Sequence, residues 1–158
     1  MILDELLEFA DASSVANAAG TVLLGDVIDL GGITQDVGLG EELWLIIQTT
    51  TEIITGGVAG TIQFFLCSDA LATLGGGVVA STTEHYATRA LITDDAGAND
   101  AELNAGGVIA AVRLPSGTYE RYLGILVTIA TTTVTAGAVN AFLTKDYAKW
   151  VAMADGSN

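Results

Sequence analysis

The sequence predicts one all-β domain of about eight short antiparallel strands, arranged as a sandwich, a jelly roll or a barrel. Three observations lead to this prediction. Short runs rich in β-branched residues recur along the chain, glycine-rich segments separate them, and no long stretch shows the 3.6-residue period of a helix. The 158 residues fit one domain, and 51% hydrophobic against 15% charged residues is a composition that folds.

The expected strands follow one another with turns between them. They lie at 21–31, 42–50, 60–68, 78–84, 86–92, 108–114, 121–130 and 133–144. Within the strand at 121–130, alternation places Leu123, Ile125, Val127 and Ile129 on one buried face. The segment 43–47 is apolar on both faces, so we expect that strand to be covered on both sides.

The uncharged stretch 125–144 is long enough to span a bilayer. Its first half is β-branched and it is rich in threonine, which favours strands over a membrane helix. We therefore expect two adjacent strands that join near Thr131–Thr133, and no contact of the protein with a membrane.

The chain is divided into an N-terminal arm (1–20), a β domain (21–146) and a C-terminal tail (147–158). Residues 2–10 show a short helical stripe that would be marginal in water on its own, so it must dock on its own domain or on a neighbour. A helical turn or an extended arm on the same domain is an equal alternative. The apolar side chains available for contact are Ile2, Leu3, Leu6, Leu7 and Phe9.

Charge and cysteine content limit the possible partners. Five basic against nineteen acidic residues give a formal net charge of −14, which repels nucleic-acid backbones and anionic membranes. Acidic residues stand near the N-terminus where a signal peptide carries basic ones, so no targeting segment is expected. The single Cys67 excludes an internal disulfide and leaves the redox compartment open, with a reducing one slightly favoured.

The only proline lies in the segment Leu114-Pro115-Ser116-Gly117, which fits a type I turn. Two of the five basic residues, Arg113 and Arg121, flank this turn. A well-made strand corner is sufficient to explain the turn. We expect its two arginines to pair with acidic residues, inside an oligomer or on a partner protein.

Residues with catalytic or metal-binding chemistry are scarce. The only histidine, His85, shows no partner at a usable spacing, and one histidine with one cysteine does not make a zinc site. The acidic segment 94–104 offers oxygens from Asp94, Asp95, Asn99, Asp100 and Glu102, but their spacing does not match an EF-hand. A solvated loop tip is the preferred reading of that segment, and whether it binds a cation is left open. We expect no enzymatic activity, no cofactor and no metal.

The tail KDYAKWVAMADGSN combines Tyr147 and Trp150 with two lysines on an otherwise acidic protein. Aromatic residues are enriched at contact surfaces. The tail is either a contact element or a frayed terminus.

Several segments resemble one family when taken in order. They are LEFADA (7–12), VIDLG (27–31), DVGLGEELWLIIQ (36–48), RLPSGTYERYLGI (113–125) and TAGAVNAFLTKD (135–146). Together they resemble the capsid cement (decoration) proteins of tailed bacteriophages, of the Bordetella-phage type. The tail after about residue 147, the acidic segment 94–104 and the glycine run 75–77 have no counterpart in this pattern.

The resemblance implies a jelly-roll sandwich that binds the outer surface of a phage head and bridges neighbouring major capsid proteins. It implies two partners, the major capsid protein and the chain itself as a homo-oligomer, with a dimer favoured over a trimer. The location is then the outer face of the virion, after synthesis in the host cytoplasm. Two alternatives remain: a carbohydrate- or receptor-binding jelly-roll module and a small β-fold hydrolase.

Overall fold

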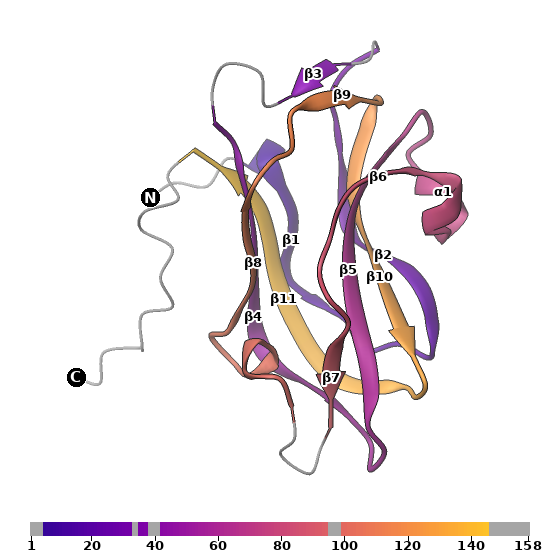
Figure 1. The fold of residues 1–158 in the computed structure, drawn as a ribbon, viewed down its shortest axis with the longest axis vertical. Coiled ribbons are helices and arrows are strands. Elements are labelled where there is room, and N and C mark those ends of the chain that lie inside the picture. Colours follow the sequence, from indigo (N-terminus) through magenta and orange to yellow (C-terminus); the bar gives the residue numbers. More distant parts are fainter. Residues whose placement is uncertain (1–4, 33–34, 38–41, 95–98, 146–158) are drawn as a thin grey trace, which may run out of the picture.

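The computed structural model describes residues 5–32, 35–37, 42–94 and 99–145, which form two packed antiparallel sheets (Figure 1). Sheet A has the order β1-β11-β4-β8, and sheet B has the order β2-β10-β5-β6, with β7 also paired to β5. The strands of sheet A are β1 (Glu8–Ser14), β4 (Trp44–Thr55), β8 (Val108–Arg113) and β11 (Val134–Thr144). The strands of sheet B are β2 (Gly20–Asp29), β5 (Gly60–Asp69), β6 (Thr83–Ala87), β7 (Leu91–Thr93) and β10 (Tyr122–Ala130).

The chain passes back and forth between the two sheets. From β1 in sheet A it enters β2 in sheet B, returns to β4, and crosses again to β5, β6 and β7. It then returns to β8, crosses to β10 and ends in β11. This order is that of a jelly roll, so the predicted fold class is confirmed.

Short elements complete the fold. A two-stranded ribbon pairs β3 (Gln35–Val37) with β9 (Gly117–Tyr119) at one end of the sandwich (Figure 1). The helical elements are η1 (Glu5–Leu7), α1 (Leu74–Gly77), η2 (Val79–Ser81) and η3 (Ala101–Leu103). Among the helices of the described residues, none has the length and apolar character that a bilayer crossing requires.

Two groups of buried side chains hold the described residues together. The inner core fills the space between the sheets and includes the predicted row Leu123, Ile125, Val127 and Ile129. A smaller outer cluster lies on the other face of sheet B, where Cys67 and Leu126 are buried beneath Leu74 of α1. Strand β10 therefore has apolar contacts on both of its faces.

Two further expectations about the strands are confirmed. Leu45, Ile46 and Ile47 are each at most 1% exposed, so β4 is buried on both faces over these three residues. The stretch 125–144 is two strands, β10 and β11, joined by residues 131–133. They lie in opposite sheets, so this connection crosses the sandwich and does not form a hairpin.

The prediction of a strand at 78–84 is wrong. Gly75, Gly76 and Gly77 all have positive φ, which turns the chain over sheet B, and η2 follows before β6 begins at Thr83. The strand expected at 86–92 is divided into β6 and β7. Thr88 lies between them and makes two hydrogen bonds to the backbone of Phe64, which interrupt the ladder. Its N–H donates to the carbonyl of Phe64, and its hydroxyl oxygen accepts from the N–H of Phe64.

The N-terminal division also needs correction. Glu8–Ser14 is a strand paired to β11, and Phe9 is 1% exposed within the inner core. The helical stripe is therefore absent from residues 8–10, and within the described part of 2–10 only Glu5–Leu7 are helical. The sandwich begins no later than Glu8 and not at residue 21. The alternation in this strand is hidden because two irregularities in the β1–β11 register shift the direction of its side chains.

Candidate interaction surfaces

The N-terminal contact residues occupy very different environments. Leu6 is 78% exposed, Leu7 packs at the margin of the inner core, and Phe9 is buried inside it. Ile2 and Leu3 lie outside the described residues. Of the predicted set, Leu6 is thus the described side chain that presents apolar area to solvent, whereas Phe9 contributes to the fold.

The two arginines that flank the proline corner pair within their own chain. Arg113 Nη1 lies 3.1 Å from Glu42 Oε1, and Arg121 makes two hydrogen bonds to Asp29, at 2.9 and 2.8 Å. The bond from Arg121 is the main cause that lowers the pKa of Asp29 to about 2. About half of each of these four side chains is exposed, so they remain accessible to a partner.

The proline corner is a junction between the sheets. Leu114 is buried, and its N–H donates to the carbonyl of Leu43. The hydroxyl of Tyr119 donates to the carbonyl of Pro115 at 2.7 Å, which fixes β9 against the corner. Arg113, Leu114, Pro115 and Ser116 also line an open pocket. The predicted strand junction is present, but it leads from β8 of sheet A through β9 to β10 of sheet B.

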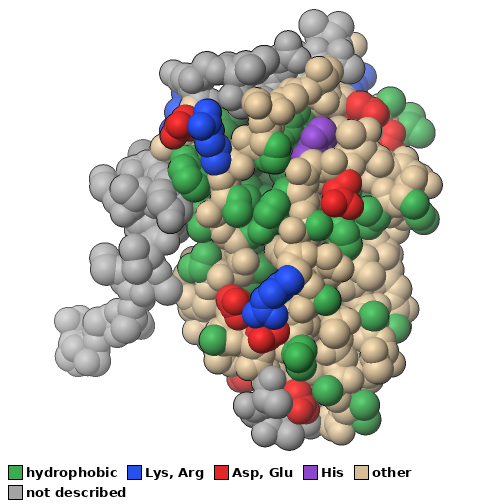
Figure 2. Space-filling view, in the orientation of Figure 1, with side chains coloured by type: hydrophobic (Ala, Val, Ile, Leu, Met, Phe, Trp, Pro, Cys, Tyr) green, Lys and Arg blue, Asp and Glu red, His purple; other side chains and the backbone are tan. Residues whose placement is uncertain are grey.

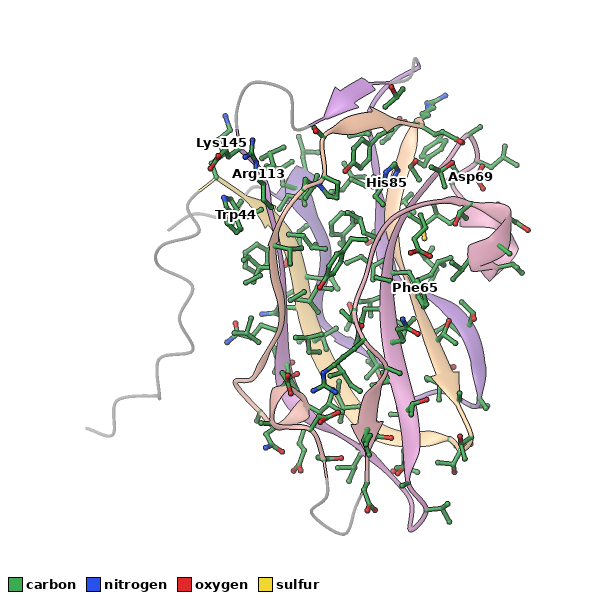
Figure 3. All side chains as sticks on the ribbon, viewed as in Figure 1. Trp44, Phe65, Asp69, His85, Arg113 and Lys145 are labelled. Carbon is green, nitrogen blue, oxygen red and sulfur yellow. The ribbon has the colours of Figure 1, made fainter. Side chains whose placement is uncertain are left out.

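His85 has a partner that sequence reasoning missed. Figure 3 labels His85 on β6. Its Nε2 lies 2.8 Å from Ser68 Oγ on β5, and its ring stacks on Tyr119 with centroids 3.8 Å apart. Ser68 Oγ also accepts from the N–H of Glu120. The Ser68 hydroxyl is therefore shared between the His85 ring and the backbone of Glu120.

The environment of this pair fits a structural role. Ser68 is fully buried, and burial lowers the pKa of His85 although the charge of Glu120 acts in the opposite direction. Burial also raises the pKa of Tyr119 to about 12. A buried hydroxyl that already accepts from a backbone N–H is poorly placed to attack a substrate. The pair joins β5, β6 and the β9–β10 connection. Seventeen positions separate the two residues, and only the register of β5 with β6 brings them together.

The acidic segment is held by its own hydrogen bonds. Asp100 accepts from Arg89 at 2.7 Å and from the N–H of Ile92 at 2.6 Å, while Arg89 also bonds Glu102. Asn99 Oδ1 accepts from the N–H of Asp94. Asp95 lies outside the described residues. In the part of the chain that the structure describes, no three acidic, histidine or cysteine side chains gather as metal ligands would.

Cys67 is buried in the outer cluster, and this burial raises the pKa of its thiol. Tyr147 and Trp150 lie outside the described residues.

Comparison with known proteins identifies the family. A family model described as Bbp16 matches residues 9–143, which is most of the chain. The chain belongs to the Bbp16 family. This name suggests a Bordetella phage protein and agrees with the resemblance found in the sequence. The Bbp16 match begins within β1 and ends within β11, so it includes residues of every strand of the jelly roll, among them β1, which the sequence pattern places in an arm. A search of curated proteins found no match.

Proposed function

We propose that this Bbp16-family protein is a structural virion component. In this proposal it binds the outer surface of a phage head, bridges neighbouring major capsid proteins and stabilises the head. The observation that carries the proposal is the Bbp16 match over residues 9–143, which agrees with the ordered cement-protein segments in the sequence. The match supports a phage protein, and the ordered segments give the more specific role.

The physical properties of the chain support an external position. A net charge of −14 disfavours contact with packaged DNA, which is itself densely negative. A jelly roll with a continuous inner core is also a rigid block that can connect two neighbouring subunits without changing shape.

The proposed partners are the major capsid protein and further copies of the same chain, a dimer before a trimer. In a symmetric shell each contact between copies is repeated many times, so each contact surface can be small. The exposed side chains of Leu6, Arg113 and Arg121 are the described residues that we assign to these contacts, together with the predicted Ile2, Leu3, Tyr147 and Trp150.

We also propose that the protein is not an enzyme. Ser68, the hydroxyl residue bonded to His85, is fully buried. The carboxylates of the acidic segment are used to hold Arg89 and the backbone of their own loop. These side chains therefore have structural work that explains their positions.

The proposal is tested with heads assembled without this protein. Purified protein is added, and particles are separated on a sucrose gradient. Saturable co-sedimentation with heads, together with slower loss of packaged DNA on heating, is the expected result. Bovine serum albumin serves as the protein control. Failure to bind heads would contradict the proposal, and binding to host cells or to polysaccharide would favour the receptor-binding alternative.

A further inference from the structure

Each sheet of a sandwich ends in edge strands whose outward backbone groups can pair with another strand. Among the described residues the edges of sheet A are β1 and β8, and those of sheet B are β2 and the β6–β7 pair. Soluble proteins protect such edges with charges, bulges, or short and interrupted strands. A comparison of the four edges shows which of them lacks protection.

Three of the edges carry these protective features. Strand β1 has two register irregularities, a positive φ at Ala12 and the exposed Asp11. Strand β2 has an irregularity near Gly25, whose φ is +57°, and an exposed Asp26. Strands β6 and β7 are short, and Thr88–Ala90 interrupt the edge between them.

The fourth edge, β8, is different. Its sequence VIAAVR carries no charge before Arg113, no proline and no positive φ, and its one irregularity lies at its start. Ile109 and Val112 are only partly buried where they pack against the inner core, as is Tyr86 on β6. Figure 2 shows hydrophobic side chains gathered between the places that β8 and β6 occupy in Figure 1.

The direction of the free backbone groups follows from the ladder. The N–H of Leu114 donates to Leu43, and Arg113 pairs with Trp44 in the same register. In an antiparallel ladder the backbone N–H and C=O groups of every second residue point toward the partner strand. Those of Val112 and Ala110 therefore also point toward β4. The N–H and C=O groups of Ala111 and Arg113 therefore point outward.

We propose that this edge pairs with β8 of a second copy, in antiparallel orientation around a two-fold axis. The inference rests on the self-association that belongs to the proposed function, and it names the surface that makes it. In the symmetric register, Ala111 lies opposite the partner subunit's Ala111. The outward-pointing residues of both strands then face each other, and the two A sheets join into one continuous sheet.

Charge complementarity favours a second copy over an unrelated strand. The end of β8 carries Arg113, and its start adjoins η3, which carries the acidic Glu102. Antiparallel pairing brings the arginine end of each copy to the acidic end of the other, twice per dimer. Within the chain Arg113 and Glu102 bind other exposed residues, Glu42 and Arg89, and such exposed pairs are weak enough to be shared.

The first test uses proline at an outward position. Ala111→Pro removes an N–H that makes no bond to β4, and edge strands tolerate proline at such a position. Ala111→Val is the matched control, because it keeps the N–H and favours a strand. In sedimentation equilibrium we expect wild type and Ala111→Val to dimerise, and the dissociation constant of Ala111→Pro to rise at least tenfold. A folded Ala111→Pro protein that dimerises like wild type would overturn the proposal.

The second test is independent of whether the proline variant folds. Ala111→Cys should form a covalent dimer under oxidised glutathione, because the two cysteines would lie opposite each other. Leu71→Cys, at an exposed residue on the other side of the sandwich, should not. Equal cross-linking of both variants, or a monomeric wild type, would overturn the proposal. Head binding is measured separately, so a protein that binds heads but does not pair through β8 contradicts only this inference.

Discussion

The inner core and the outer cluster are built in different ways. In the inner core, apolar side chains alternate along strands of both sheets, and the two sheets cover each other. In the outer cluster, sheet B supplies Cys67 and Leu126, but the cover is Leu74 of α1, within an irregular segment that contains three glycines of positive φ. Regular strands bury the inner core, and one short irregular segment buries the outer cluster. The comparison shows that a jelly roll can bury both faces of a strand without a third sheet.

The largest expected effect is in the inner core. Phe9→Ala removes a side chain that is 1% exposed, and we expect the free energy of unfolding to fall by about 3–5 kcal/mol. Leu6→Ala, three positions earlier and largely exposed, should change it by less than about 0.5 kcal/mol. Urea denaturation measures both. Equal small losses would mean that β1 is a detachable arm and not a core strand.

In the outer cluster we expect a truncated leucine to lower the free energy of unfolding by an amount at the low end of the range for buried leucines. Leu74→Ala should cost about 2–3 kcal/mol, because an irregular segment can partly collapse into the space left. Leu71→Ala is the matched control in the same segment, and it should be close to neutral because Leu71 is 65% exposed. A neutral Leu74→Ala would show that α1 does not stabilise sheet B.

Gly124 sharpens the comparison further, because it is the place where β10 meets α1. A Cβ at this position would overlap Leu74 Cδ1 and contact Val27. Gly124→Ala should therefore destabilise the protein by about 1–3 kcal/mol through overpacking. The double variant with Leu74→Ala should lose less free energy of unfolding than the sum of the two single variants, since the alanine at position 74 removes the overlap. Strict additivity in urea denaturation would contradict this contact.

The smallest effect concerns His85 and depends on pH. Because burial lowers its pKa in the folded state, the unfolded chain binds the proton first as the pH falls through about 6.5. Stability should decrease below that pH, with a slope of at most about 1.4 kcal/mol per pH unit for one proton. His85→Gln should reduce this slope between pH 8 and 5. An unchanged slope would show that His85 does not titrate differently on folding.

The same residue tests the proposal that the protein is not an enzyme. We expect His85→Ala to leave the biological role intact in a phage infection assay, provided that the variant folds. Loss of head stability by a fully folded His85→Ala protein would contradict this expectation.

Sequence reasoning succeeded where the pattern is local and regular. Alternation identified the buried row of β10, and an unbroken apolar run identified the doubly covered segment of β4. It failed where long-range pairing decides the structure. Nothing local marks Ser68 as the partner of His85, since the contact exists only in the β5–β6 register. Phe9 was assigned to an arm because register irregularities hide its strand. The glycine run 75–77 indicates a break between strands, but nothing local shows that the chain then covers sheet B and continues into η2.

Whether the protein is present on phage heads, and at which position, tests the central claim most directly. An electron cryomicroscopy map of intact heads would show density at each binding position. We expect the jelly roll to fit density on the outer face of the shell, between neighbouring major capsid proteins. A head map without such density, or density for this fold only at the tail fibres, would contradict the proposed function.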